Sequence, residues 1–170
     1  MDRNAEIRKA QERIVSVYRK RPKKALSTTH ARAHIGEGLT CTFRQGDHRA
    51  VMDMGKLLGG DDKGPTPGFF VRAGLAGCVA IGIKLTAARE SIPIDALDVD
   101  IEMDFDDSAV FGLGSNSAAP LETRFIITIK SRAPWEDVTA MVDRALAIDT
   151  YFVALRDAQK VSACLAPSAG

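Results

Sequence analysis

The sequence predicts an α+β fold, with antiparallel strands before and after one long central helix. Three short strand-like runs fill residues 27–54, and glycine-containing turns separate them. Residues 64–85 form a long apolar segment, and a helix is expected from Pro67, a common kind of first helical residue, to about Glu90. Residues 96–106 alternate between apolar and acidic side chains, the pattern of a strand with one face in water. With 170 residues, the chain is long enough for one domain with its own hydrophobic core.

The composition is that of an ordinary globular protein, with 45% hydrophobic and 26% charged residues. The net charge of +1 is not that of a dedicated nucleic-acid-binding protein, so we expect no nucleic-acid partner. The charge is unevenly distributed. Residues 1–24 hold nine Lys and Arg against three Asp and Glu, a balance of +6, which leaves −5 for the rest of the chain.

The first expected element is an amphipathic helix over residues 4–20, which Pro22 limits. Its apolar positions recur three and four residues apart; they are Ile7, Ala10, Ile14 and Val17. We therefore predict a basic helical extension over residues 1–24, followed by a domain over residues 25–170. Such a helix packs on its own domain or on a second subunit, or it lies on an anionic membrane or on nucleic acid.

Three antiparallel strands are expected next, as a meander with turns at GEG and at Gly46-Asp47. They are predicted at residues 27–35, 39–45 and 48–54. A loop rich in glycine, aspartate and proline then leads to the central helix. Thr66 is its expected N-cap and Pro67 its first residue, and the helix should end near Glu90.

The central helix is apolar almost all the way round from Phe69 to Ile83, so we expect it to be buried on all sides. It is also rich in glycine, although glycine costs about 1 kcal/mol relative to alanine inside a helix. That composition makes sense where a second backbone comes very close. Cys78 lies in this zone, either as a small core residue or as a thiol held where a substrate meets it.

Five further elements complete the prediction. The strand over residues 96–106 comes first, with acids on its wet face. Pro134 suits the first position of a helix, and Glu136 and Asp137 place acids in its first turn, where the helix dipole favours them. The remaining three elements are a strand at residues 121–131, a helix at residues 150–159 and a last strand at about residues 160–165.

Several kinds of site are not indicated. Cys41, Cys78 and Cys164 form no CxxC pair and no zinc-site spacing, so we expect free thiols and no metal. The run FGLGSNS lies in a loop between strands and is not a dinucleotide-binding fingerprint, so no cofactor is expected. No apolar leader segment is present, and charges interrupt the longest apolar run, which argues against a membrane span. The expected location is the reducing cytoplasm.

The segments GPTPGFFVRAGLAGC, IPIDALDVDIEMDFD and ALAID, in this order and spacing, resemble the OsmC/Ohr family of osmotically induced proteins and organic hydroperoxide reductases. The resemblance covers about residues 27–166 and is to a divergent OsmC-like member. It implies an OsmC-like fold of antiparallel sheets around long central helices. It also implies an intertwined homodimer with active sites at the subunit interface.

The resemblance further implies which residues form the site. Cys78 matches the family's peroxidatic cysteine, whose thiolate attacks a peroxide oxygen, expels an alcohol and becomes a sulfenic acid. A cation must lower the thiol pKa, because only the thiolate reacts well. In the family, an arginine from the N-terminal strands does this. Arg32 is our choice here, and His30 and His34 share its strand face.

Two positions differ from catalytic members of the family. Those members carry a resolving cysteine near the start of a late helix, where this chain has Asp149. They often carry a glutamate after the loop proline, where this chain has Gly68. Asp149 would act as a general base or as a hydrogen-bond acceptor for Cys78, and a carboxylate beside a thiol raises its pKa. Cys41 or Cys164 would serve as a resolving thiol only within disulfide distance of Cys78.

Two functions follow from these residues. In the first, Cys78 reduces small organic hydroperoxides in a one-cysteine cycle that an external thiol reductant completes. In the second, the protein is non-catalytic and binds a small apolar ligand at the dimer interface. The first function predicts a thiol that is alkylated fast at neutral pH, and the second predicts an inert buried thiol.

Overall fold

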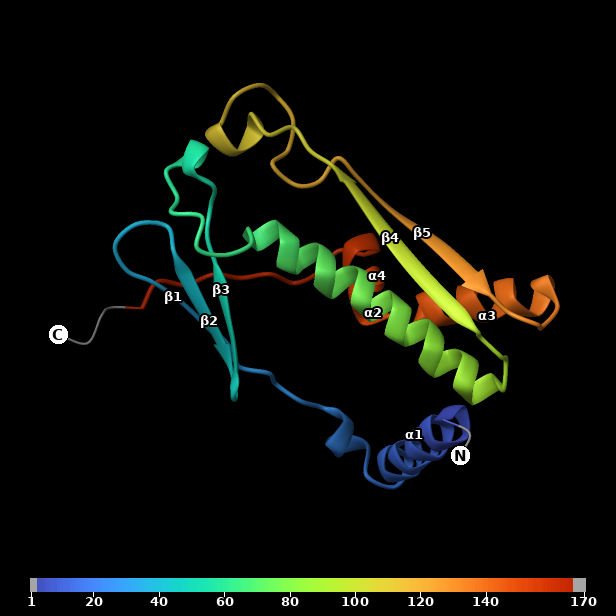
Figure 1. Ribbon diagram of the computed structural model, residues 1–170. Coiled ribbons are helices and arrows are strands. Elements are labelled where there is room, and N and C mark those ends of the chain that lie inside the picture. Colours follow the sequence, from blue (N-terminus) through green and yellow to red (C-terminus); the bar gives the residue numbers. More distant parts are fainter. Residues whose placement is uncertain (1–2, 167–170) are drawn as a thin grey trace.

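The computed structural model describes residues 3–166 and has the predicted α+β architecture, with two antiparallel sheets. Figure 1 shows α2 between the two sheets, with α1 beside its C-terminal end. The outermost residues of the expected regions 1–24 and 25–170 lie outside the described residues. In chain order the elements are α1 (Arg3–Lys20), β1 (Arg32–Ile35), β2 (Cys41–Gln45), β3 (His48–Met52), α2 (Pro67–Glu90), β4 (Ala96–Asp104), β5 (Glu122–Lys130), α3 (Trp135–Ala147) and α4 (Thr150–Arg156), with short 3-10 turns at residues 22–25, 56–58 and 109–111.

The N-terminal helix is confirmed, and it packs on its own domain only through its first half. Most side chains up to Gln11 are half-buried, whereas all those from Glu12 to Lys20 are exposed. The Gln11 side-chain amide donates to the Leu85 carbonyl oxygen of α2 at 3.1 Å. The second half of α1 therefore extends beyond this contact with its charged and apolar side chains in solvent.

The meander β1–β2–β3 is confirmed, with shorter strands than predicted. Arg32 at the start of β1 already faces Arg44, one residue before the end of β2. Residues 27–30 would lie opposite the turn at Gly46-Asp47 and beyond, where β2 has ended, and the predicted strand 27–35 is reduced to its last four residues. A sequence pattern marks residues that suit a strand, whereas the length of the neighbouring strand sets where pairing stops.

The hydrophobic core lies between α2, α3 and the β4–β5 hairpin. The two strands pair antiparallel over nine residues each, and the inward side chains of β4 alternate as predicted. Helix α2 has the predicted bounds, and α3 begins one residue later than expected because Pro134 takes the N-cap position. The buried cluster consists of Val79, Ile83, Ala87, Ile94, Met141 and Ala145.

Two expectations are wrong for the single chain. The predicted last strand at about residues 160–165 is an exposed segment without strand structure, and α4 ends at Arg156. This segment has the composition of a strand, but it pairs with no edge among the described residues. A strand forms only where a neighbour accepts and donates its backbone hydrogen bonds.

The second wrong expectation is that the central helix is buried on all sides. One face of α2 packs on the core, and the opposite face is open although it is apolar. Val71 is 53% exposed and Ile81 is 63% exposed. A Cβ atom added at Gly74 or Gly77 would meet no atom within 4 Å. The single chain therefore leaves uncovered the face on which the sequence gathers its glycines.

Among residues 3–166, α2 is the one helix long and apolar enough to cross a membrane, judged by length and composition alone. The core helix of a folded domain meets the same criterion. Because α2 packs against α1, α3, α4 and β4, it gives no clear membrane span.

Candidate functional site

Cys78 lies in the middle of α2, where the helix passes from its packed face to its open face. The helix begins at Pro67, after Thr66 in the N-cap position, and runs without interruption to Glu90. Position 78 is therefore about three turns from the N-terminus, too far for the helix dipole to act strongly on the thiol. The side chain is half-buried next to the buried Val79.

Asp149 lies across from this part of α2, at the start of α4. It is only 6% exposed. Its Oδ1 atom accepts hydrogen bonds from the backbone N–H groups of Tyr151 at 3.1 Å and Phe152 at 2.9 Å, the arrangement of a helix N-cap. The Phe152 ring packs against Phe125 of β5, with 5.6 Å between ring centroids. The carboxylate is thus held in a fixed position by α4 and by the packing of α4 on the sheet.

The second oxygen of this carboxylate faces α2. A Cβ atom at Gly82, one turn after Cys78, would lie 3.0 Å from Asp149 Oδ2. This is closer than a side chain normally comes, so a glycine at position 82 lets the carboxylate approach the helix. The close approach brings Asp149 within hydrogen-bonding reach of the Cys78 thiol.

The surroundings raise the pKa of the Cys78 thiol above its ordinary value. Burial is the largest cause, followed by the hydrogen bond that the thiol donates to Asp149 and by the negative charge of that carboxylate. The Tyr151 backbone N–H lowers the pKa by a smaller amount. These surroundings within the chain favour the protonated thiol, which is the less nucleophilic form.

Cys78 and Asp149 line one cavity of about 290 Å³. Most of its wall is apolar, and Arg89 lies at the end of the cavity toward the C-terminus of α2. The remaining lining residues are Ile81, Gly82, Leu85, Thr86, Ala145, Ile148 and Thr150. A cavity with apolar walls and a few polar groups at defined places is the usual form of a small-molecule site.

Arg32 is not brought to Cys78 within the chain. It lies on β1 and lines a separate cavity of about 550 Å³, together with His34, while His30 is exposed before the strand. Arg32 faces Arg44, and Arg44 faces Arg49 on the next strand. The N-terminal sheet thus carries a row of three arginines away from the cavity of Cys78.

The other cysteines are free thiols. Cys41 is half-buried on β2 and Cys164 is exposed near the C-terminus, and neither lines the cavity of Cys78. Within the described part of the chain, no group of three His, Cys, Asp or Glu side chains is arranged to hold a metal ion. Gly68 stands beside Arg72, whose Nη1 atom would lie 3.2 Å from an added Cβ.

Sequence reasoning missed two residues of the cavity. In the sequence, Gly82 is one of several small residues in an apolar helix. The one signal that could have identified it is its position four residues after Cys78, which places both on the same helix face. Arg89 was one of several charges at the end of the helix. The structure distinguishes both, because α4 approaches Gly82 and the cavity extends to Arg89.

The family model of OsmC-like protein matches residues 60–162. No curated protein gives a match. The solved structure of an OsmC-like protein from Mycoplasma pneumoniae is similar, with 18% identity and a TM-score of 0.65. The matched region covers 76% of this chain and 88% of the Mycoplasma chain. An organic hydroperoxide resistance protein from Elizabethkingia anophelis has 20% identity and a TM-score of 0.60, with coverage of 77% and 89%.

A third structure, of a putative organic hydroperoxide resistance protein from Vibrio cholerae, holds captopril in one of its active sites. It has 17% identity and a TM-score of 0.55, with coverage of 77% of this chain and 85% of its own. At these identities the structures establish the fold. Together with the family model, which spans more than half of the sequence, they confirm the resemblance of the motifs around Cys78. The chain belongs to the OsmC-like protein family.

Proposed function

We propose that this OsmC-like protein binds the apolar part of a small organic molecule in the Cys78 cavity, beside a thiol that stays protonated. The observation that carries the proposal is the placement of Cys78 and the buried Asp149 in one mostly apolar cavity. The apolar wall supplies the affinity, because it removes hydrocarbon surface from water. The thiol and the carboxylate supply a polar end that orients the molecule.

The electrostatics of the cavity argue against a fast peroxidatic thiol. A peroxidatic cysteine needs a neighbouring cation, and here the neighbouring group is a carboxylate that raises the pKa. Asp149 is fixed by its two backbone hydrogen bonds, so it does not turn away from the thiol at low cost. The cation that lines the cavity, Arg89, lies eleven residues beyond Cys78, about 16 Å along the helix.

The protein acts as a homodimer in this proposal, with the cavity beside the subunit interface. The chain exposes 13091 Å², whereas a compact monomer of 18.3 kDa exposes about 8,100 Å². Obligate interfaces bury about 2,000–5,000 Å² or more counted over both partners, so an excess of roughly 5,000 Å² in one chain is ample for such an interface. The open face of α2, with Gly74, Gly77 and Ile81, is the apolar surface that a second copy would cover.

The structure with captopril supports a small organic ligand for this fold, since a drug-sized molecule occupies an active site of that relative. The present cavity differs by the carboxylate of Asp149. We therefore expect a ligand that presents a hydrogen-bond donor or a neutral group to this end of the cavity, because an anion there would meet a fixed negative charge.

Reduction of organic hydroperoxides is the second candidate function. It is favoured by the partial exposure of Cys78 in a cavity that accepts small molecules. In this reaction the thiol and a hydroperoxide give a sulfenic acid and an alcohol. One external thiol then forms a mixed disulfide and water, and a second external thiol releases Cys78. Arg32 of the partner subunit would be the activating cation, since Arg32 does not reach Cys78 within one chain.

Binding of decan-1-ol to the reduced protein tests the first proposal. We expect saturable binding by calorimetry and slower alkylation of Cys78 by iodoacetamide when the alcohol is bound. Ile148→Asp, in the cavity wall, should weaken binding about tenfold or more, because it places a charge against hydrocarbon. Val110→Asp is the matched control, since Val110 is 67% exposed and Ile148 68% exposed, and Val110 lies outside the cavity. Binding that is absent, or equally weakened by both variants, would overturn the proposal.

A further inference from the structure

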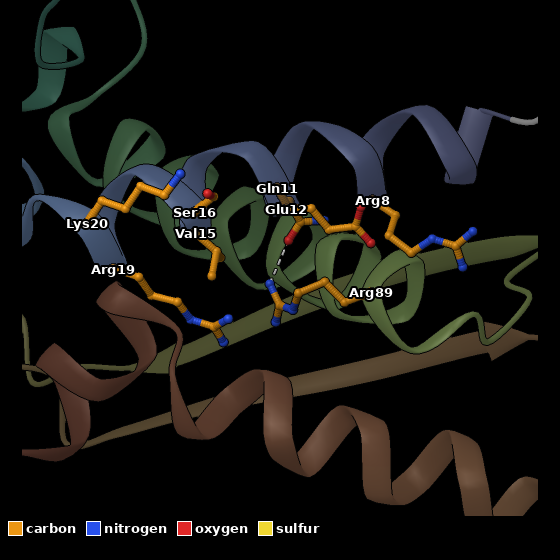
Figure 2. Close-up of a pocket in the computed structure, with 8 residues that line it drawn as sticks. All are labelled: Arg8, Gln11, Glu12, Val15, Ser16, Arg19, Lys20 and Arg89. Atoms are coloured by element: carbon orange, nitrogen blue, oxygen red, sulfur yellow. Dashed lines mark hydrogen bonds between the residues drawn. The ribbon is translucent and has the colours of Figure 1, made fainter.

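A second cavity of about 420 Å³ adjoins the Cys78 cavity, between α1 and the C-terminal half of α2 (Figure 2). Arg89 is the residue that the two cavities share in their lining. We call the second cavity the α1–α2 groove. It is lined by Arg8, Gln11, Glu12, Val15, Ser16, Arg19, Lys20 and Arg89.

The α1–α2 groove is strongly basic. Four of its lining residues are cations, namely Arg8, Arg19, Lys20 and Arg89, against the single carboxylate of Glu12. In the part of the chain from residue 3 to 166, no salt bridge pairs any of these four cations. These cations are spread along the groove: Arg8, which donates to the Ser91 hydroxyl, and Lys20 lie at opposite ends of it in Figure 2, about 18 Å apart along α1.

Two of the cations come from different helices and face the same space. Figure 2 shows the guanidinium groups of Arg19, from α1, and Arg89, from α2, extending to the same side of α1. Arg89 is held there by the Gln11 side chain, whose Oε1 atom accepts from Nη1 at 2.7 Å, and by Thr86, whose hydroxyl accepts from Nη2 at 2.7 Å. A guanidinium has five N–H donors, so three remain for another acceptor.

We propose that the α1–α2 groove binds the anionic group of an organic molecule whose apolar part lies in the Cys78 cavity. This inference rests on the proposed function of that cavity and adds the chemical class of the ligand, an amphipathic carboxylate or phosphate. Arginine binds both groups through paired hydrogen bonds. The anion lies at the Arg89 end, about 16 Å along α2 from Cys78, so it stays clear of the Asp149 carboxylate.

The groove also gives α1 a function. This helix lies outside the residues that the family model matches, and it packs on α2 only through its first half. Its second half supplies Arg19 and Lys20, which line the groove without packing on the core. Helices α2, α3 and α4 already provide the apolar part of the cavity, and α1 thereby adds a polar end to it.

Calorimetric titration with decanoate, decan-1-ol and butanoate tests the inference on the full chain. All three are used below the concentration at which decanoate forms micelles. We expect decanoate to bind about tenfold more tightly than decan-1-ol, as charge-assisted hydrogen bonds predict, and the preference to weaken at high salt. In Arg19→Gln/Lys20→Gln, decanoate should bind as weakly as decan-1-ol. The control Lys9→Gln/Arg13→Gln removes the same charge from exposed positions of α1 outside the groove and should keep the preference.

The other outcomes separate the two proposals. Equal binding of decanoate and decan-1-ol, both weakened by Ile148→Asp, would overturn the groove as an anion site and leave the cavity proposal standing. Equal binding of decanoate and butanoate, unaffected by Ile148→Asp, would overturn the coupling of the groove to the cavity. The proposed function would fall as well only if decan-1-ol also failed to bind. Binding only to vesicles that contain anionic lipid would overturn the inference in favour of a membrane-surface role for α1.

Discussion

Replacing Gly74 and Gly77 together by alanine tests whether a second chain covers the open face of α2. In the single chain an added Cβ atom meets nothing within 4 Å at either position. An isolated chain would therefore gain about 1 kcal/mol per substitution, the difference between glycine and alanine inside a helix, or about 2 kcal/mol for the pair. In a homodimer the two methyl groups would press on a neighbouring helix, which costs roughly 1–3 kcal/mol per site.

The two cases differ in sign, so the experiment is decisive. Urea unfolding at two protein concentrations measures the free energy, and sedimentation measures the assembly state. We expect the double variant to dissociate more readily than the natural protein, and to unfold at a lower urea concentration when the protein is dilute. A gain of about 2 kcal/mol that does not depend on protein concentration would refute the homodimer.

Three further predictions concern the site and the fold. Asp149→Asn removes the carboxylate that helps raise the pKa of Cys78, so alkylation by iodoacetamide at neutral pH should become faster; an unchanged pH profile of the rate would contradict this reasoning. Arg144 forms a bidentate pair with Glu90, with N···O distances of 2.9 and 2.6 Å, and this pair lowers the Glu90 pKa. The pair therefore stabilises the fold at pH values above the ordinary glutamate pKa of about 4.3, and this contribution is lost as the pH falls. Glu90→Gln should therefore lower the urea midpoint at neutral pH and have little effect near pH ~3, and an equal effect at both would exclude a charge origin. Ile83 is fully buried, so Ile83→Ala should cost about 2–5 kcal/mol in denaturant unfolding, and a loss below about 1 kcal/mol would place the core elsewhere.

The elements of the fold were predictable where local patterns decide them. The alternation over β4 and the proline at the start of α2 each gave the element and one of its bounds. The strand ends were not predictable in the same way, because the length of β2 sets how much of residues 27–35 pairs. The segment at residues 160–165 has strand-like composition but meets no partner within the chain.

The central helix shows a different limit. Its composition indicated burial all round, and the structure shows one open apolar face at Val71 and Ile81. Composition reports how much apolar surface must be covered, but not which chain covers it. The same reasoning from a glycine-rich helix therefore leads to a homodimer, which stays a prediction.

The candidate site was predictable in its centre and not in its surroundings. Resemblance of the segment around Cys78 and of the late helix brought Cys78 and Asp149 together, and the structure places both on one cavity. The close approach at Gly82 depends on how α4 packs on α2, and the α1–α2 groove depends on where α1 docks. Contacts of this kind join residues far apart in the sequence, and no local pattern specifies them.

The most direct test of the account is the single-turnover reaction of the reduced protein with cumene hydroperoxide at neutral pH. Mass spectrometry would follow loss of the Cys78 thiol, with hydrogen peroxide and the Cys78→Ser variant for comparison. We expect Cys78 to be oxidised no faster than an ordinary free thiol, and more slowly still when decan-1-ol occupies the cavity. Rapid oxidation that is selective for the organic hydroperoxide and absent in Cys78→Ser would contradict it. That result would establish the second candidate function instead.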